Sequence, residues 1–548
     1  MNQHLFRRFL SGSWHKIAVL SVLGALGSAC GVYMALISKK VVDTATGQVP
    51  GRLLPIGLLL LGVLLLQLLL EVLLTVLHVD TVTKIRFKIQ SQLFERYLHK
   101  QKRSVEGFHS GELVNRISGD SSIVAEGVGN VIPSLISVGT RILLSFGALL
   151  MLDSVLAVLC VLAGILMLGF ARLYRKMTGD IFRECRACEG RIRSFIQETA
   201  QNLTVIKAFS VYSVVLRQLG RAQDDAYALT IRKNRLSIGA NICFYVAMSA
   251  GYYMALAYGA WQISRGVMTF GTLTAVLGLT GDVTTPFRDL ASLFPQYLSI
   301  HASEERLEEI WNLPEEEELP AADTDALYQS LFEIQISDLD FSYGTLPVLR
   351  HADASFLKNK LTAVTGNSGA GKSTLLNLLA GILRPDSGAI TLKTANGGVP
   401  LNSALRGMFA YVPQDFLLLS GSVLENITLF EEEPDMERFK AAVRMAECED
   451  VIDALPDGIY TFLGEGGGRL SGGQRQRMTI ARALYSRAQV LLMDESTSAL
   501  SADTEEKILR HLCHSGRTVI FVTHRDTVSA LCDRVLHMQD GKITLQHE

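Results

Sequence analysis

The stretch of sequence that decides the fold reads Gly366-Asn367-Ser368-Gly369-Ala370-Gly371-Lys372-Ser373. It fits the pattern G-x-x-x-x-G-K-[ST], follows an apolar run at 361–365 and precedes a helical stretch at 374–379. A strand, a glycine-rich loop and a helix in this order are typical of a phosphate loop. The glycines let backbone N–H groups approach phosphates, and the helix N-terminus adds a positive partial charge. We therefore expect this loop and Thr374 to bind a nucleotide, with Lys372 on its β- and γ-phosphates and Ser373 on Mg²⁺.

A second stretch, Val490-Leu491-Leu492-Met493-Asp494-Glu495, is an apolar strand pattern that ends in two carboxylates. Downstream of a phosphate loop, such a strand predicts that Asp494 holds Mg²⁺ and that Glu495 polarises the attacking water. The alternative interpretation is a strand that ends in a polar turn. The phosphate loop upstream favours the catalytic interpretation.

The pentapeptide Leu470-Ser471-Gly472-Gly473-Gln474 resembles the signature of the ATP-binding cassette (ABC) superfamily. Other cassette elements follow in the family's order. The resemblance implies that Tyr343 stacks on adenine, that Gln414 contacts Mg²⁺ and the membrane domain, and that His524 contacts the γ-phosphate. It also implies that Ser471, Gly472, Gly473 and Gln474 contact the ATP held by a second copy of the chain.

One departure from the family lies in Ser498-Ala499-Leu500, which resembles the start of the D-loop. The family usually has Asp at the next position, where this chain has Ser501. We expect the lost carboxylate to alter communication between sites without removing hydrolysis, and Asp503 is not expected to replace it. By the resemblance, two chains complete two ATP sites. Because the ATP-site residues are intact, a homodimer is favoured over a heterodimer.

Composition and charge point to a membrane protein. The 52 Lys and Arg residues and 54 Asp and Glu residues leave a net charge of −2, which argues against a nucleic-acid partner. Charged residues make up 19% of the chain, less than the roughly 25% usual in soluble domains. The apolar runs lie almost entirely before residue 300. A wholly soluble enzyme and a wholly disordered chain are both excluded.

The apolar runs are long enough to cross a bilayer, which needs about 20 apolar helical residues. Two segments between them, 80–130 and 175–238, hold most of the Lys and Arg of residues 1–312, so we expect both segments and both termini on the cytoplasmic side of the inner membrane. We expect both segments to be long helices that project tens of Å past the lipid. The six predicted spans are Ile17–Ile37, Leu53–Val79, Val131–Leu152, Ser154–Tyr174, Gly239–Ile263 and Gly271–Tyr297.

The basic segments also resemble ABC exporters. Phe108-His109-Ser110-Gly111-Glu112-Leu113 and Asp120 resemble the family's first cytoplasmic loop, and Glu198 with Ile206-Lys207-Ala208-Phe209 resembles the second. The resemblance implies that both loops hold coupling helices that dock onto the nucleotide-binding domains. It therefore implies a half-transporter that joins a membrane domain to one cassette.

The expected fold class is a multi-domain membrane protein. An all-α, six-helix transmembrane domain (the type I exporter or type IV ABC fold) occupies 1–312. A linker follows at 313–330, and an α/β phosphate-loop NTPase cassette occupies 331–548. The implied function is ATP-driven export by alternating access.

Two ionisable residues, Arg141 and Asp282, lie inside predicted spans at about the depth of the bilayer midplane. Charges there are costly, so we interpret them as residues that face the transported substrate. The alternative is structural pairing between helices. The mostly apolar spans are compatible with an amphipathic or apolar cargo such as a drug, a lipid or a peptide. An importer that uses the exporter fold, and a non-transporting ABC regulator or channel, remain alternative functions.

Overall fold

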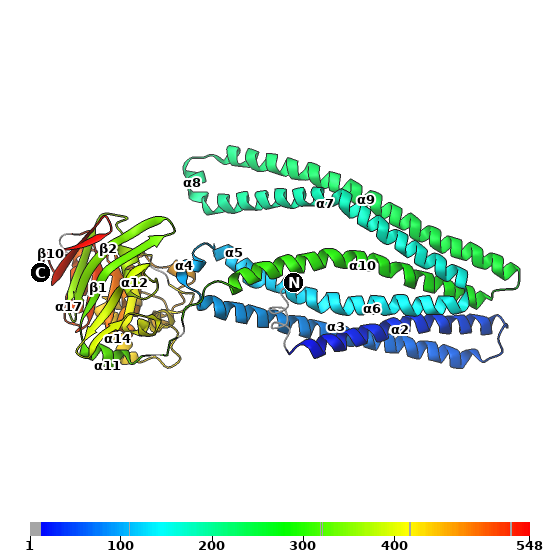
Figure 1. Ribbon diagram of the computed structural model, residues 1–548, viewed down its shortest axis with the longest axis horizontal. Coiled ribbons are helices and arrows are strands. Elements are labelled where there is room, and N and C mark those ends of the chain that lie inside the picture. Colours follow the sequence, from blue (N-terminus) through cyan, green and yellow to red (C-terminus); the bar gives the residue numbers. More distant parts are fainter. Residues whose placement is uncertain are drawn as a thin grey trace. The chain divides into compact units, whose positions relative to one another are not determined.

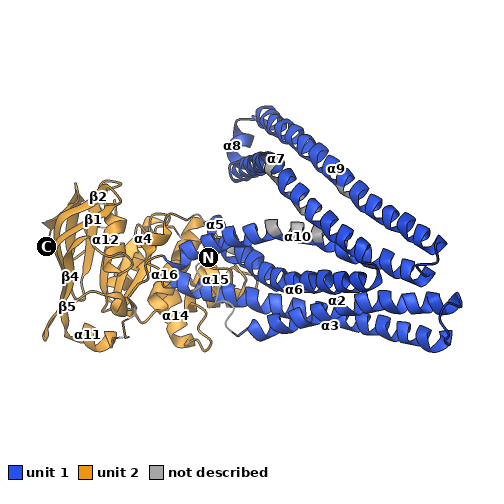
Figure 2. Cartoon of the chain, turned by 45° about the vertical axis from the view of Figure 1, so that its right-hand side comes forward, with its two compact units in different colours: residues 1–98, 109–312 blue, residues 99–108, 313–548 orange. Residues whose placement is uncertain are grey.

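Two units of different architecture make up the chain in the computed structural model, which describes residues 12–547 apart from 109, 318, 321, 416–417 and 526–528. Unit 1 comprises residues 1–98 and 109–312, and unit 2 comprises residues 99–108 and 313–548. Figure 2 draws unit 1 in blue and unit 2 in orange. Residues 99–108, which the sequence analysis placed in the membrane domain, group with unit 2.

Unit 1 is entirely helical over its described residues. Its elements are α2 (Trp14–Ala45), α3 (Leu53–Leu98), α5 (Ser110–Val114), the π-helix η1 (Asn115–Asp120), α6 (Ser121–Leu152), α7 (Ser154–Gln201), α8 (Leu203–Ala208), α9 (Tyr212–Ser264) and α10 (Phe270–Trp311). Four of the helices are longer than 40 residues: α3, α7, α9 and α10. In α3, α7 and α9 an apolar segment and a basic segment form one continuous helix. Both basic segments are largely helical, as predicted, but neither is one continuous helix. The first is interrupted between α3 and α5, and the second at the turns on either side of α8.

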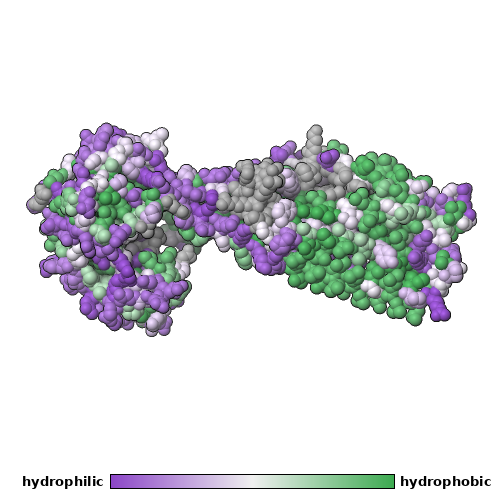
Figure 3. All heavy atoms as spheres, turned by 60° about the horizontal axis from the view of Figure 1, so that its bottom comes forward, coloured by the Kyte–Doolittle hydropathy of each residue, from purple (hydrophilic) through white to green (hydrophobic). Residues whose placement is uncertain are grey.

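Each predicted membrane span lies within one of these helices. Among the described residues, four helical stretches are long and apolar enough to cross a membrane: Trp14–Ala45, Leu53–Leu98, Ser110–Leu152 and Tyr212–Ser264. The fourth and sixth predicted spans lie in α7 and α10, whose apolar stretches are shorter. On the face of unit 1 shown in Figure 3, hydrophobic side chains gather over the middle of the helices, with hydrophilic ones toward both ends, as a lipid-facing surface requires.

The helices of unit 1 form two groups. Helices α2, α3, α6 and α10 contact one another, and α7 packs along α9. Figure 1 shows α7 and α9 running side by side, with α8 connecting them at one end. The turn between α6 and α7 is a single residue, Asp153, whose side chain accepts a hydrogen bond from the Leu156 backbone N–H at 3.0 Å. This cap explains the tight hairpin predicted between the third and fourth spans.

Unit 2 contains two sheets. The smaller is antiparallel with strand order β2-β1-β4-β5, and the larger has the order β10-β9-β3-β8-β7-β6, with all neighbours parallel except β9 and β10. The strands are β1 (Leu331–Tyr343), β2 (Leu346–Leu357), β3 (Leu361–Gly366), β4 (Ser387–Thr394), β5 (Gly397–Pro400), β6 (Phe409–Val412), β7 (Val490–Asp494), β8 (Thr518–Val522), β9 (Arg534–Gln539) and β10 (Lys542–His547). Every residue of β7 and β8 is buried, as expected for a parallel sheet that is covered on both faces.

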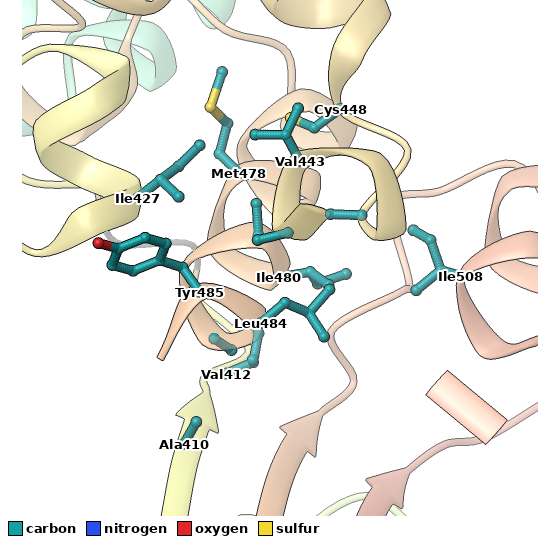
Figure 4. Close-up of a cluster of buried hydrophobic side chains, with 14 of the residues drawn as sticks. Ala410, Val412, Ile427, Val443, Cys448, Met478, Ile480, Leu484, Tyr485 and Ile508 are labelled. Atoms are coloured by element: carbon teal, nitrogen blue, oxygen red, sulfur yellow. The ribbon is translucent and has the colours of Figure 1, made fainter. Parts of the chain in front are cut away.

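The helices of unit 2 supply the two hydrophobic cores that enclose the larger sheet. One core joins α13, α14, α16 and α17 to β6 and β7, and Figure 4 shows part of it, including Val443, Met478 and Ile508. The other core lies between the two sheets and includes α12. The helices are α4 (Lys102–Val105), α11 (Thr324–Ser330), α12 (Lys372–Leu379), η2 (Ser403–Met408), α13 (Val423–Thr428), α14 (Met436–Met445), α15 (Glu449–Asp453), η3 (Gly458–Tyr460), η4 (Glu465–Gly467), α16 (Gly472–Tyr485) and α17 (Ala502–Cys513).

The predicted linker has structure of its own. Its last residues form α11, and Tyr328 is buried, with its hydroxyl bonded to Asn359 at 2.9 Å and to Thr518 at 2.8 Å. The second half of the linker therefore contributes to the core of unit 2. The composition of the linker did not predict this contribution, because it depends on one buried residue, Tyr328.

Candidate functional site

The order of strands in the larger sheet brings the predicted catalytic groups to one edge. Strand β3 pairs in parallel with β8, β8 with β7, and β7 with β6. The register aligns Val364 and Asp494 with the same residue, Val522. The carboxyl ends of these strands therefore meet at one edge, which is where ligands bind in open α/β sheets.

The phosphate loop follows β3 at this edge. Gly366, Gly369 and Gly371 have φ angles of 145°, 80° and 97°, which side chains rarely adopt. A Cβ on Gly366 would lie 2.2 Å from the Met538 carbonyl oxygen, so the loop passes too close to β9 for any side chain there. Asn367, Ser368 and Gly369 are exposed, and Ala370 is half-buried, so the loop presents its backbone outward at the start of α12.

Lys372 is the first residue of α12, and it is only 5% exposed. Its Nζ donates hydrogen bonds to the carbonyl oxygens of Gly366 at 3.0 Å and Asn367 at 2.9 Å. Burial lowers the pKa of Lys372, whereas the nearby carboxylates Glu495 and Asp494 act to raise it. The ammonium therefore lies inside the loop and close to both predicted catalytic carboxylates.

Asp494 ends β7 and is 2% exposed. Its Oδ2 accepts a hydrogen bond from the Tyr411 hydroxyl at 3.1 Å, but its buried Oδ1 accepts none within the described part of the chain. Burial raises the pKa of Asp494, although the hydroxyls of Ser373 and Tyr411 beside it act in the opposite direction. A buried carboxylate oxygen without a partner, next to a serine hydroxyl, fits a hard cation such as Mg²⁺.

Glu495, the next residue, is held by two side chains from neighbouring strand ends. Its Oε1 lies 2.8 Å from Nε2 of His524, which follows β8. Its Oε2 accepts a hydrogen bond from Nε2 of Gln414, which follows β6, at 3.1 Å. The backbone φ of Glu495 is +44°, an uncommon value for a residue with a side chain, and such strain is often found at functional sites. The structure thus brings together Glu495, His524 and Gln414, the three residues expected to be catalytic.

Tyr343, the predicted adenine platform, ends β1 in the smaller sheet. Its ring meets the buried ring of Phe341 edge to face, with centroids 5.0 Å apart and planes at 87°. This contact orients the Tyr343 ring, which remains 36% exposed and is free to stack on a base.

The signature residues form the N-terminus of α16. The Ser471 hydroxyl accepts a hydrogen bond from the Gln474 backbone N–H, and Gln474 Oε1 accepts one from the Ser471 N–H at 2.9 Å. This capping box holds Ser471 at the N-terminus of α16, and Ser471 itself is exposed. Gly472 is half-buried, and a Cβ on Gly473 would lie 2.9 Å from the Ala499 carbonyl oxygen. The glycines therefore permit close contact with the D-loop.

Sequence reasoning missed Gln476, which is completely buried behind the signature. Its Oε1 accepts a hydrogen bond from the Ala499 N–H at 3.0 Å, and its Nε2 donates to the Glu495 carbonyl oxygen at 3.4 Å. One amide side chain therefore connects α16 to the D-loop and to the residue after β7. Its spacing, five residues after Ser471, gave no signal, because nothing in the sequence places α16 against β7.

Ser501, which replaces the family's D-loop aspartate, caps α17. Its hydroxyl accepts a hydrogen bond from the Thr504 N–H at 3.3 Å. Asp503 forms an ion pair with Lys507 at 2.7 Å on the exposed face of α17, in keeping with the prediction that it does not replace the missing carboxylate. A second missed contact lies nearby: Arg525 donates to buried Glu505 and to the Ser498 carbonyl oxygen.

In unit 1, Arg141 on α6 and Asp282 on α10 form an ion pair. The structure therefore shows the pairing between helices that was the alternative to a substrate contact. The Arg141 side chain is still 41% exposed, against 19% for Asp282. Asp282 is therefore the more enclosed member of the pair, and part of the Arg141 side chain remains accessible.

The loop residues that resemble exporters lie in different places. Asp120 is buried and accepts two hydrogen bonds from Arg306 on α10, at 2.9 and 2.6 Å. Glu112 accepts a hydrogen bond from Arg116 at 2.7 Å, whereas His109 lies outside the described residues. Asp120 therefore connects η1 to α10 within unit 1. Phe108, the first residue of the motif, groups with unit 2 together with the rest of 99–108.

The second loop forms the short helix α8, with exposed apolar side chains at Leu203, Val205 and Phe209. Helix α8 lies between α7 and α9 in unit 1 (Figure 1). The motif Ile206–Phe209, which carried the resemblance, thus ends in an exposed aromatic ring.

Comparisons with known proteins match both units. Residues 17–287 match the family described as the ABC transporter transmembrane region, and residues 349–498 match the family described as ABC transporter. The chain is 27% identical over 457 residues to an ATP-dependent lipid A-core flippase of Desulfotalea psychrophila, covering 82% of this chain and 79% of the flippase.

Two relatives are longer than this chain. It is 30% identical over 447 residues to the lactococcin-A transport/processing ATP-binding protein of Lactococcus lactis, covering 79% of this chain but 60% of that protein. It is also 30% identical over 479 residues to the cyclolysin secretion/processing ATP-binding protein of Bordetella pertussis, covering 86% of this chain and 66% of that protein. Among solved structures, a bacterial Atm1-family ABC exporter with ATP bound aligns with a TM-score of 0.81 at 21% identity, covering 97% of this chain and 95% of the exporter.

Proposed function

We propose a function from the premise that the chain belongs to the ABC transporter superfamily and joins, in one polypeptide, a membrane region to a transporter ATPase domain. The proposal is ATP-driven export of a substrate across the cytoplasmic membrane by a homodimer. The observation that carries it is the single sheet edge where the phosphate loop, Asp494 and Glu495 meet His524 and Gln414.

The geometry of this edge supports hydrolysis of a nucleoside triphosphate. The Glu495 carboxylate, oriented by His524 and Gln414, is placed to accept a proton from water as its oxygen attacks the γ-phosphorus. The bond from the γ-phosphorus to the bridging oxygen then breaks, and ADP leaves. Lys372 and the loop N–H groups stabilise the charge on the phosphates. Ser373, Asp494 and Gln414 would hold Mg²⁺, which supplies further charge neutralisation when bound.

A second copy would complete each site. The signature residues form a capped helix N-terminus at the exposed Ser471, which is suited to the γ-phosphate of ATP held by a partner. In a homodimer, the two phosphate loops and two signatures make two composite sites. Closure on ATP and reopening after hydrolysis would alternate the membrane region between inward- and outward-facing states.

The membrane region supports transport of an amphipathic or apolar cargo. Its long helices α3, α7 and α9 each join an apolar segment to a basic segment. By the positive-inside rule, this supports a cytosolic location for both termini and unit 2. Exposed α8, with Phe209, suits docking onto a partner's nucleotide-binding domain. The relatives named for lipid A and for peptides make lipids and peptides the first cargoes to test. The partly exposed Arg141 is the residue we propose to face the cargo, with Asp282 behind it.

The test has two stages. The full chain, purified alone in lipid nanodiscs, should hydrolyse ATP, and Glu495→Gln should bind ATP without hydrolysing it. In inside-out vesicles that contain the chain, ATP should drive uptake of a labelled lipid or peptide. ATP binding without hydrolysis in the wild type would refute the homodimer and point to a different partner chain. Cargo movement out of inside-out vesicles would refute export in favour of import.

A further inference from the structure

The segment 99–108 is bound to the rest of unit 2 by a pattern of main-chain hydrogen bonds. The Gln101 N–H donates to the Pro314 carbonyl oxygen at 3.1 Å, and the Glu316 N–H donates to the His99 carbonyl oxygen at 2.8 Å. Lys100 Nζ, which is buried, donates to the Leu313 carbonyl oxygen at 2.7 Å and to Glu315 Oε1 at 2.8 Å. These contacts fix the start of α4, so the next two residues, Lys102 and Arg103, have defined partners.

Lys102 is connected by hydrogen bonds to the phosphate end of the proposed ATP site. Its Nζ donates a hydrogen bond to Oδ1 of Asn377 at 3.1 Å, and Nδ2 of Asn377 donates to the Ser373 carbonyl oxygen at 2.7 Å. Asn377 is 7% exposed and also contacts the Tyr411 hydroxyl, which bonds to Asp494. One buried amide is therefore connected to two of the three residues proposed to hold Mg²⁺, directly to Ser373 and through Tyr411 to Asp494.

Arg103 leads to the adenine end. Its guanidinium donates to Oδ1 of Asp386 at 2.8 Å, and Oδ2 of Asp386 accepts the Ser342 N–H at 2.8 Å. Ser342 lies between Phe341 and Tyr343, the two rings that meet edge to face. The Arg103 guanidinium also lies 5.7 Å from the centre of the Phe341 ring. Asp386 thus connects Arg103 to the backbone that carries the adenine platform.

We propose that Asn377 and Asp386 are positioning residues that couple the segment 99–108 to opposite ends of the ATP site. The phosphate branch, Lys102–Asn377–Ser373, sets the position of the magnesium ligands. The adenine branch, Arg103–Asp386–Ser342, sets the position of Tyr343. The inference rests on the proposed function, because it takes ATP as the ligand of the site.

Two branches that reach different parts of the nucleotide make a distinctive prediction. Inorganic tripolyphosphate lacks a base. Its affinity should therefore depend on the phosphate branch and not on the adenine branch. A general loosening of unit 2 would instead affect ATP and tripolyphosphate equally. For the adenine branch, the ratio of the two affinities therefore separates positioning from a merely structural role. For the phosphate branch, the half-saturating Mg²⁺ concentration makes the same distinction.

The experiment uses the full chain in nanodiscs and changes the outer residue of each branch, since Asn377 is buried and its loss risks misfolding. Arg103→Ala should raise KM for ATP about threefold, as expected for loss of a half-exposed charged contact, and leave the inhibition constant of tripolyphosphate unchanged. Arg103→Lys should restore most of the ATP affinity. Lys102→Ala should raise the half-saturating Mg²⁺ concentration about threefold and weaken ATP and tripolyphosphate by the same factor.

A double variant tests Asp386 directly. If Arg103 acts through Asp386, Arg103→Ala combined with Asp386→Asn should raise KM no further than the larger single change. The matched control is Lys440→Ala, which removes a lysine from an exposed ion pair with Glu437 on α14 and should behave as wild type.

Three results would overturn the inference: equal effects of Arg103→Ala on both ligands, additive effects in the double variant, or no effect of either alanine change. All three presuppose a wild-type chain that hydrolyses ATP. A wild-type chain without hydrolysis would instead contradict the proposed function. In that case, direct titration of ATP and tripolyphosphate onto Glu495→Gln and its Arg103→Ala derivative still decides the inference by the same ratio.

Discussion

Two sets of buried or half-buried charges, one in each unit, are built on opposite principles. At the sheet edge of unit 2, Asp494 keeps a buried oxygen that accepts no hydrogen bond from the described residues, and Glu495 is held by two side chains that orient it. In unit 1, Arg141 and Asp282 neutralise each other across two helices. The first arrangement leaves a negative charge available for a ligand. In the second, each charge is largely neutralised by its partner in the ion pair.

The difference shows why perturbed or buried charge by itself does not identify a site. Membrane spans bury ionisable groups only when they are paired, so a pair such as Arg141–Asp282 has a structural explanation. A buried carboxylate next to a lysine, with one oxygen unused, has none until a cation and a phosphate are added. The variants below test whether the charges of unit 2 bind a ligand and whether the pair in unit 1 only stabilises the fold.

The largest effect is expected at Glu495. Glu495→Gln removes the proton acceptor while it keeps the size of the side chain, so kcat for ATP hydrolysis should fall about 10²- to 10⁴-fold. ATP binding, measured by equilibrium titration, should stay within about threefold of wild type. Hydrolysis at near wild-type rate would mean that another group activates the water. Lys440→Ala serves as the control for purification and reconstitution.

The next effect concerns the unused oxygen of Asp494. Asp494→Asn replaces an anionic ligand with a neutral one, so the Mg²⁺ concentration for half-maximal hydrolysis should rise at least about tenfold. Chelation of Mg²⁺ by EDTA should abolish hydrolysis in the wild type, and added Mg²⁺ should restore it. An unchanged Mg²⁺ requirement in Asp494→Asn would show that the buried oxygen is not a metal ligand, and the contrast with unit 1 would disappear.

A smaller effect is expected at the membrane pair. Breaking a fully buried ion pair costs about 3–5 kcal/mol, and the partial exposure of Arg141 reduces this to about 1–2 kcal/mol in the stability of unit 1. Arg141→Ala and Asp282→Ala should each lower the thermal midpoint in nanodiscs, and the double variant should lose less than the sum.

Transport in the same variants separates the two interpretations of the pair. The double variant lacks both charges of the pair, so it should regain part of the stability that each single variant loses. If Arg141 faces the cargo, this double variant should still be deficient in uptake by inside-out vesicles. Wild-type uptake in the double variant would assign the pair to structure alone.

The smallest effect is expected at the D-loop. Ser501→Asp restores the family's usual residue, and aspartate is as good an N-cap as serine, so α17 should be equally stable. We expect the rate of ATP hydrolysis to change by less than about threefold. A change of an order of magnitude would show that the serine is a strong regulator of the two ATP sites.

Much of the site was accessible from the sequence because its motifs are local. The phosphate loop needs glycines and a lysine at a set spacing, and Asp494 and Glu495 stand at the end of an apolar strand pattern. Their approach to His524 could also be expected, since strands of a parallel sheet end at a common edge. Gln476 and Asn377 could not be found this way, because their partners lie on strands and helices whose packing no local pattern specifies.

The sequence by itself determined the two-part organisation, the long helices and the chemistry of the nucleotide edge, because hydrophobic periodicity and short motifs encode them locally. Only the tertiary structure decided which groups remain available for ligands. In the tertiary structure, Arg141 pairs with Asp282, residues 99–108 belong to unit 2, and Oδ1 of Asp494 accepts no hydrogen bond within the part of the chain that the structure describes. The physical reason is that a charge is satisfied or left open by neighbours distant along the chain, and only folding brings those neighbours together.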